Sequence, residues 1–240
     1  MRRMGIIDVI FLSLDSLKNQ PSLLLPILFS FILCYLIFSS VFKTFEVSQL
    51  LENLNQLIVV SVALYLVVVS AASIVCGMTK TGIVTGESTI GDGLREAETH
   101  IFSVIVAFMI VGIISGILLI GGILVVTQLI SEAGVMAALL YAFVIQVSFM
   151  LGILFLYALP AIIIDELDSI TAIGLSIGIV LNHLRESMVL AFLALVSLVA
   201  AYFVSMYIPG IYHYILLLLI YSLVVTLLVM SVTVDYVNLK

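Results

Sequence analysis

Long uncharged apolar stretches dominate the pattern of hydrophobic and polar positions along this chain. A bilayer core of about 30 Å requires about 20 apolar residues in helical conformation, and six stretches reach that length. Since lipid offers the peptide groups no water to bond, such stretches cross a membrane as helices. We therefore predict an all-α, polytopic membrane protein whose single transmembrane domain covers the whole chain. The predicted spans are residues 21–42, 57–77, 101–127, 135–164, 188–208 and 211–234.

The boundary between the third and fourth spans rests on a few polar residues. Residues 101–164 are too many for one helix, and Gln128, Ser131 and Glu132 indicate a tight outer turn between two. Pro160 lies near the inner end of the fourth span, where its missing N–H predicts a kink or a break in regular hydrogen bonding.

Three shorter segments place apolar residues three and four positions apart, which is typical of amphipathic helices. They are residues 6–19, 90–99 and 168–184. Asp168 is a candidate N-cap for the third, and Thr89–Asp92 resembles a capping box. We predict helices lying in the plane of the cytoplasmic membrane surface or docked on the spans. The alternative is that each is only an extension of the next span. The predicted apolar faces comprise Ile7, Ile10, Phe11, Leu14 and Leu17, then Leu94 and Ala97, then Ile170, Ile173, Ile177, Val180, Leu181 and Leu184.

The order in-plane helix, span, span recurs three times and suggests a threefold internal repeat. Such a repeat predicts three similar hairpins around an axis normal to the membrane. Chance is the alternative, because apolar helices align easily. The alignment matches four residues of the first segment with four of the third, in this order: Ser13 with Ser176, Leu14 with Ile177, Leu17 with Val180, and Asn19 with Asn182.

Composition and charge support this layout. Of the 240 residues, 64% are hydrophobic and 9% charged, whereas soluble domains carry about 25% charged residues. Lys and Arg favour the cytoplasmic side, so we predict a cell-membrane protein with both termini in the cytoplasm.

Asp8 and Asp15 interrupt the first apolar region, so we expect no cleavable signal peptide. This orientation leaves Lys43 outside and places inside Arg2, Arg3, Lys18, Lys80, Arg95, Arg185 and Lys240.

Polar side chains inside the spans are few. Gln146 and Ser148 lie near the middle of the fourth span, and Ser115 lies in the third. These three residues are candidates for a polar intramembrane site. The alternative is that they hydrogen-bond between helices, as amides in spans commonly do.

Glycines in the third span indicate close helix packing, because small residues let helix backbones approach in lipid. A hinge or a dimer contact is the alternative. The glycines concerned are Gly112, Gly116, Gly121 and Gly122.

Catalytic signatures are absent from the sequence. Metalloprotease, hydrolase, nucleotide-binding and paired-cysteine motifs do not occur, and the basic residues form no nucleic-acid footprint. We expect no catalytic residue, metal or cofactor, and no disulfide between Cys34 and Cys76. A metal or lipid-phosphate site at the inner acids is the alternative to solvated helix ends. Those residues are Asp92, Glu96, Glu98, Asp165, Glu166 and Asp168, with His100 and His183.

One stretch carries a family resemblance. Residues 156–176 combine a span ending in Pro160-Ala, the acidic Asp165, and an in-plane helix containing Ala172 and Ser176. Together with the opening Ser13-Leu-x-x-Leu-x-x-x-Pro21, this resembles the membrane-domain family named after glycerophosphoryl diester phosphodiesterase and related archaeal and bacterial membrane proteins. The resemblance implies a fold and not an activity, since the phosphodiesterase activity belongs to a separate soluble domain.

Three functions remain as hypotheses. The first is a non-enzymatic membrane module that acts through lipid, through a membrane or cytoplasmic protein, or through a second copy of itself. The second is a transporter or channel for a small solute or lipid, with a path near Gln146 and Ser115. The third is an interfacial lipid enzyme using Asp165 and His183.

Overall fold

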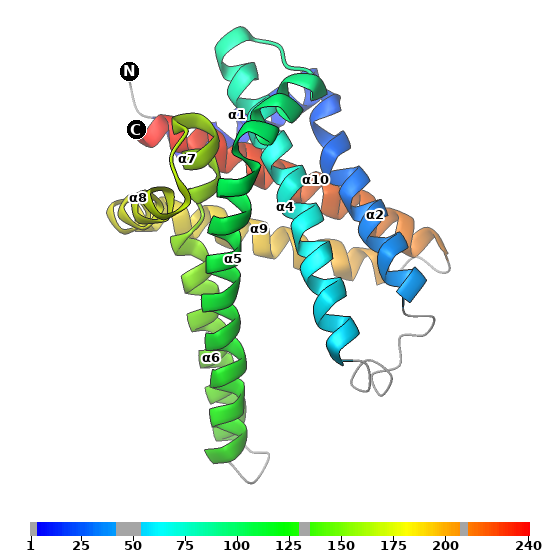
Figure 1. The fold of residues 1–240 in the computed structure, drawn as a ribbon, viewed down its shortest axis with the longest axis vertical. Coiled ribbons are helices and arrows are strands. Elements are labelled where there is room, and N and C mark those ends of the chain that lie inside the picture. The colour runs from blue at the N-terminus through cyan, green and yellow to red at the C-terminus, as the bar shows by residue number, and fades with distance from the viewer. Residues whose placement is uncertain (1–3, 42–53, 130–134, 207–210) are drawn as a thin grey trace.

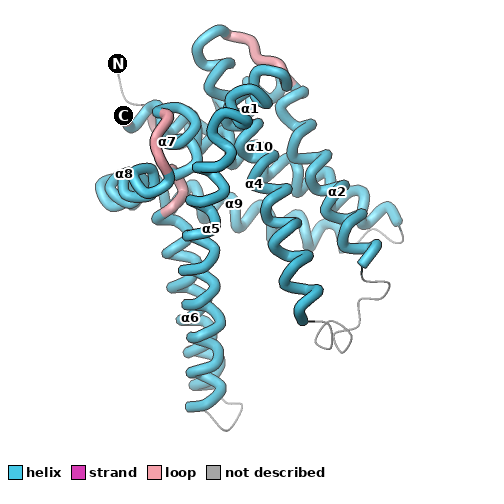
Figure 2. Tube along the Cα trace, in the orientation of Figure 1, coloured by secondary structure: helices cyan, strands magenta, loops and turns pink. Residues whose placement is uncertain are grey.

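Helices make up nearly all of the described chain, which in this computed structural model comprises residues 4–41, 54–129, 135–206 and 211–240 (Figure 1). Figure 2 shows that short loops join them, and these described residues contain no strand. The elements are α1 (Ile6–Asn19), η1 (Pro21–Leu24), α2 (Leu25–Val41), α4 (Leu54–Thr85), α5 (Ile90–Leu129), α6 (Val135–Leu154), α7 (Ala158–Asp165), α8 (Ser169–Asn182), α9 (Leu184–Met206) and α10 (Ile211–Leu239).

Six helical stretches in this part of the chain are long and apolar enough to cross a membrane. The predicted all-α fold with six candidate spans is therefore confirmed. The turn expected at Ser131 and Glu132, the Pro209-Gly210 turn and Lys43 lie outside the described residues. Both cysteines are free thiols.

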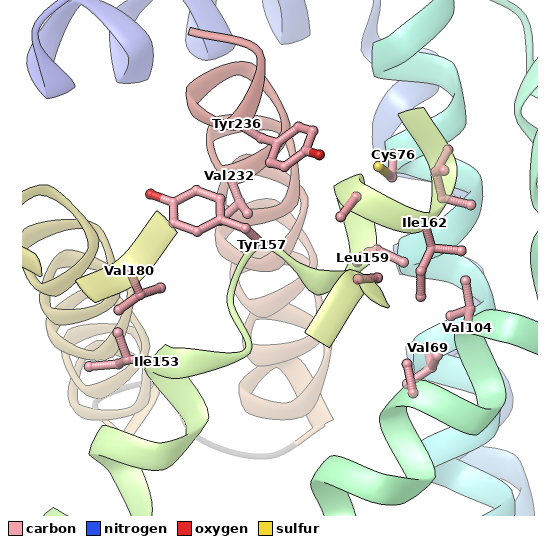
Figure 3. Packing of buried hydrophobic residues seen from close by; sticks show 14 of the residues in the cluster. Val69, Cys76, Val104, Ile153, Tyr157, Leu159, Ile162, Val180, Val232 and Tyr236 are labelled. Atoms are coloured by element: carbon pink, nitrogen blue, oxygen red, sulfur yellow. The ribbon is translucent and has the colours of Figure 1, made fainter. Parts of the chain in front are cut away.

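The long helices form three hairpins that diverge from one end of the molecule. Figure 1 shows α5 and α6 descending together past the ends of α2 and α4, while α9 and α10 cross behind them. The second helices of the hairpins, α4, α6–α7 and α10, meet at the common end, where α7 contacts both α4 and α10. Figure 3 shows that apolar side chains from all three fill this centre.

Two of the three predicted short helices are separate elements, α1 and α8. Residues 90–99 instead form the first turns of α5, as the extension alternative has it. The capping-box interpretation is confirmed, since the Thr89 N–H donates to Asp92 at 2.9 Å and the Asp92 N–H donates to the Thr89 hydroxyl at 3.2 Å. Asp168 caps α8 through the N–H groups of Ile170 and Thr171, and its hydrogen bonds with Thr171 lower the pKa of this carboxyl.

The faces that α1 and α8 bury match the predicted apolar stripes only in part, at Leu17 and Val180. α1 buries Val9, Ser13 and Leu17, while Ile7 and Phe11 are each 66% exposed. The reason is that small side chains permit close docking on neighbouring helices, whereas a large apolar side chain on the outside meets lipid rather than water.

α8 follows the same rule. It buries Ala172, Ser176 and Val180, and leaves Ile170 74% exposed. Ser13, which the proposed repeat aligns with Ser176, is fully buried as well. The repeat itself stays a prediction.

The predicted fourth span is interrupted between α6 and α7. α6 ends at Leu154, and α7 begins at Ala158, so Pro160 lies in the first turn of α7, where its missing N–H costs no helical bond. The Ser176 hydroxyl donates to the Leu154 carbonyl at 2.8 Å and accepts the Tyr157 N–H at 3.0 Å. One side chain from α8 therefore satisfies a peptide group on each side of the break.

Replacing Ser176 by Ala tests this role. The change leaves a partly buried carbonyl and a buried N–H without their partner, so we expect a loss of about 1–3 kcal/mol in the free energy of unfolding. The matched control is Ser148→Ala, because the Ser148 hydroxyl bonds only the Val144 carbonyl of its own helix. Thermal unfolding in detergent should separate the two variants, and equal melting temperatures would contradict the assignment.

Candidate functional site

Polar side chains gather at the end of the molecule where α4, α7 and α10 meet. We call this cluster the polar end. It includes two Tyr–Asp pairs and a Lys–Glu pair, and it surrounds the break between α6 and α7. Its members are Lys80, Glu96, Tyr157, Asp165, Ser187, Asp235, Tyr236 and Lys240.

The first Tyr–Asp pair lies inside the protein. Tyr157, fully buried in the break, donates its hydroxyl to Asp235 Oδ2 of α10 at 2.6 Å. Asp235 is 2% exposed, and Ser187 of α9 approaches the same tyrosine hydroxyl at 3.4 Å. A buried carboxylate needs such donors, because burial without them is costly. This pair therefore ties the broken helix to α10.

The second pair is at the other end of α7. Tyr236 donates its hydroxyl to Asp165 Oδ2, and the Lys240 ammonium lies 2.5 Å from Asp165 Oδ1. The centroids of the Tyr157 and Tyr236 rings are 6.4 Å apart. Figure 3 shows the first ring at the break and the second on α10. Consecutive residues of α10 thus bind the beginning and the end of α7.

Lys80 connects α4 to the same end of α7. Its ammonium lies 2.7 Å from Glu96 Oε2 of α5 and donates to the Ile163 carbonyl at 3.0 Å. A cation near the last carbonyls of a helix is favourable. The ion pair therefore fixes α4, α5 and α7 to one another.

Asp235 and its partners were missed by the sequence reasoning, which ended the sixth span at 234 and found no ionisable side chain inside a span. The structure continues α10 to Leu239 and buries Asp235 within it. The sequence does indicate that the helix continues past Asp235, because its neighbours Val234, Tyr236 and Val237 are apolar or aromatic rather than part of a polar run.

The three polar candidates from the sequence lie outside the polar end. Gln146 is exposed on α6, whereas Ser148 and Ser115 are partly buried on α6 and α5. The Ser148 hydroxyl bonds the Val144 carbonyl of its own helix. Within the described residues, no hydrogen bond joins these three side chains into one site.

The predicted packing glycines occupy different surroundings. A Cβ on Gly122 would lie 2.6 Å from a Val144 methyl carbon, so α5 and α6 approach closely there. Gly112 lies at ordinary contact distance from a tyrosine of α4, while Gly116 and Gly121 have no such neighbour within 4 Å.

The tightest glycine contact is between α4 and α5, where none was predicted. A Cβ on Gly93 would lie 2.6 Å from the Ile74 carbonyl oxygen and 2.4 Å from a Met78 side-chain carbon. Gly77 on α4 faces Glu96 of α5 in the same way. Only glycines permit this approach, which sets the distance across which Lys80 reaches Glu96.

Asp165 and His183, the two residues considered for a lipid enzyme, lie in different parts of the helix framework. Asp165 bonds Tyr236 and Lys240, and His183 lies at the junction of α8 and α9. No group of three or more His, Cys, Asp or Glu side chains in the described part of the chain could hold a metal ion. The hydrogen bonds of the polar end thus connect helices to one another.

Tyr157→Phe and Asp235→Asn test the buried pair. Tyr157→Phe deprives a buried carboxylate of a donor, so we expect a loss of about 1–3 kcal/mol in the free energy of unfolding. The double variant should lose less than the sum, with a coupling of about 0.5–3 kcal/mol. Chemical unfolding in detergent measures all four forms. Tyr35→Phe is the control, since Tyr35 is 47% exposed, and strict additivity would contradict the pairing.

Comparison of the chain with protein-family models, with curated proteins and with solved structures gave no match. The resemblance noted in residues 156–176 accordingly stays a prediction. What can be said of function rests on the geometry of this chain.

Proposed function

We propose that this integral membrane protein is a non-enzymatic module that acts by binding lipid hydrocarbon. The observation that supports the proposal is an apolar groove between α2, α4 and the first turns of α5, with a volume of about 760 Å³. That volume falls within the range of about 300–1,000 Å³ typical of ligand sites. The groove is lined by Leu25, Pro26, Leu28, Phe29, Ser30, Ile32, Leu33, Leu66, Val67, Ser70, Ala71, Ile74, Ile90 and Leu94.

The chemistry of the groove favours a hydrocarbon chain. Neither of its two serine hydroxyls is available to donate to a ligand. Ser30 donates to the Ile27 carbonyl and Ser70 donates to the Leu66 carbonyl, each at 2.8 Å. A peptide helix is the other possible occupant, but with its side chains it is about 10 Å wide. Only about two turns of such a helix would fit in this volume. A single acyl chain is thinner and suits a long groove without polar contacts.

The short helices support a lipid partner as well. Phe11 of α1 and Ile170 of α8 are among the most exposed large side chains of the described chain. Such residues are favourable at the boundary between headgroups and acyl chains. We infer that α1 and α8 lie at that boundary and that their buried faces dock on the spans.

The transporter and channel alternative stays a prediction. None of the four cavities described in the structure is lined by Tyr157, Asp235 or Gln146. A buried carboxylate beside a broken helix is common at transport sites, but here its hydrogen bonds hold α7 and α10 together. The lipid-binding function therefore has the better support.

We further propose that the polar end faces the cytoplasm of a cell and that both termini are there, because Lys80, Arg95, Arg185 and Lys240 gather on that side. A membrane-impermeant maleimide should label Glu87→Cys and Arg185→Cys only after the cells are opened. Lys43→Cys should be labelled on intact cells. Labelling of Glu87→Cys from outside would contradict the proposed orientation. It would not contradict the proposal that the groove binds lipid.

Filling the groove should displace its lipid. Ser70→Trp places a large side chain in the groove, so we expect the purified variant to lose the lipid that the wild-type chain keeps through detergent washing. Native mass spectrometry would count the bound lipid. Because the chain contains no Trp, fluorescence of the new side chain also reports whether its surroundings stay apolar.

The control for this experiment is Phe102→Trp, which changes a side chain that is 77% exposed and outside the groove. That variant should keep its lipid. Equal retention by both variants, or complete removal of lipid from the wild-type chain by mild washing, would contradict the proposed function.

A further inference from the structure

A second cavity lies between α1 and α4, beside the polar end. Both helices pack on α10 and on η1, so these two elements close the space between them on two sides. The resulting α1–α4 cavity has a volume of about 340 Å³, which falls within the range of about 300–1,000 Å³ typical of small-ligand sites. It shares no lining residue with the apolar groove.

The floor of the α1–α4 cavity is apolar. Leu23 of η1, Met78 of α4 and Met230 of α10 line it, and each is at most 2% exposed. The same three side chains belong to the apolar core that joins these elements. The carbon skeleton of a ligand can therefore lie on this floor without displacing a core residue.

The wall of the cavity carries uncharged hydrogen-bonding side chains, namely Ser16, Asn19, Gln20 and Thr79. Within the described residues, the Ser16 hydroxyl makes no hydrogen bond and the Asn19 amide bonds only Asp15, at 3.5 Å. The Thr79 hydroxyl donates to a carbonyl of its own helix at 2.8 Å, so it can still accept a hydrogen bond. These side chains therefore keep both donors and acceptors available to a ligand.

Gln20 is held in place by the turn between α4 and α5. Its amide donates to the Gly86 carbonyl at 3.0 Å and accepts from the Ser88 hydroxyl at 2.9 Å. Gly86 has a φ of 84°, which favours glycine at the turn that presents this carbonyl. Since a primary amide has two N–H donors and two acceptor lone pairs, Gln20 keeps one of each for a ligand. The wall is thus oriented before a ligand binds.

We propose that the α1–α4 cavity binds an uncharged ligand with several hydroxyl groups, of the kind that a sugar carries. A hydroxyl group both donates and accepts, as the spare groups of Ser16, Asn19 and Gln20 do. None of the described residues that line the cavity carries a charge. A phosphate or a carboxylate would therefore lose its water there without gaining a counter-charge, which is unfavourable.

A free sugar and the sugar headgroup of a lipid share this chemistry, and two probes distinguish them. Radiolabelled glucose tests the free sugar, by equilibrium dialysis against the full chain in phosphatidylcholine nanodiscs. A monoglucosyl diacylglycerol tests the lipid, in competition with phosphatidic acid that has the same acyl chains, and native mass spectrometry counts what stays bound. The apolar groove offers hydrocarbon contacts only, so a preference between these two lipids measures the cavity. We expect glucose or the glucolipid to bind, and the glucolipid to be preferred on the order of tenfold if it does.

Gly82→Leu fills the cavity. The nearest side-chain atom to a Cβ on Gly82 would be 3.8 Å away, on Ser88, so a larger side chain can enter the space. Replacing a helical glycine also favours the helix, so we expect a folded chain without detectable binding of the sugar. The matched control is Gly116→Leu, since Gly116 lies outside the cavity and a Cβ there has no neighbour within 4 Å. That variant should bind as the wild-type chain does.

Ser16→Ala removes a hydroxyl that bonds nothing else in the described part of the chain. The dissociation constant should rise about fivefold, as the loss of one hydrogen bond implies, while the melting temperature stays unchanged. Ser148→Ala removes a hydroxyl outside the cavity and should leave binding as it is. Ser70→Trp fills only the apolar groove, so it too should leave the binding of glucose unchanged.

The proposal is wrong if neither glucose nor the glucolipid binds, or if phosphatidic acid is retained as well as the glucolipid. It is also wrong if Gly82→Leu binds the sugar with wild-type affinity. Binding of the glucolipid without glucose supports a lipid as the source of the sugar, and binding of glucose supports a solute. Loss of lipid from the groove affects neither result, so this site and the proposed function can fail separately.

Discussion

The peptide groups on either side of the α6–α7 break are the constraint on which the rest of the structure depends. In lipid, a peptide group without a hydrogen bond costs several kcal/mol, so a span can be interrupted only where a neighbour supplies the missing partners. Ser176 supplies one on each side of the break. α8 must therefore lie against α6 and α7, and the capping of α8 by Asp168 and its small buried face follow from that requirement.

The break in turn determines the arrangement of the polar end. It turns the chain so that Tyr157 reaches Asp235, while the eight residues of α7 bring Asp165 to Tyr236 and Lys240. A continuous helix could not present both ends of this segment to the same stretch of α10. Replacing either member of a buried polar pair costs more than the pair contributes, since the remaining group is left buried. Polar residues here specify which helices meet.

Sequence reasoning recovered the six candidate spans and two of the three short helices, because length and lack of charge determine what crosses a bilayer. It recovered the buried faces only in part, at Leu17, Ala97 and Val180. The rule that apolar stripes face inward holds in water, but in lipid the outside is apolar too, so Phe11 and Ile170 lie outside while Ser13 and Ser176 are buried. It missed Asp235 because a carboxylate was taken to end a span, whereas the Tyr157 hydroxyl allows it to lie within one. Neither the Tyr–Asp partners nor the Gly93 contact follows from local spacing, since both join residues distant in sequence.

The same reasoning explains how an apolar groove can lie close to the polar end. Hydrogen bonds and close glycine contacts hold the helices at that end, and the hairpins diverge from it toward the far end. The groove between α2, α4 and the first turns of α5 begins beside that end, and its two serine hydroxyls bond carbonyls of their own helices. A surface without donors or acceptors can select only by shape and hydrocarbon contact, which suits a lipid chain.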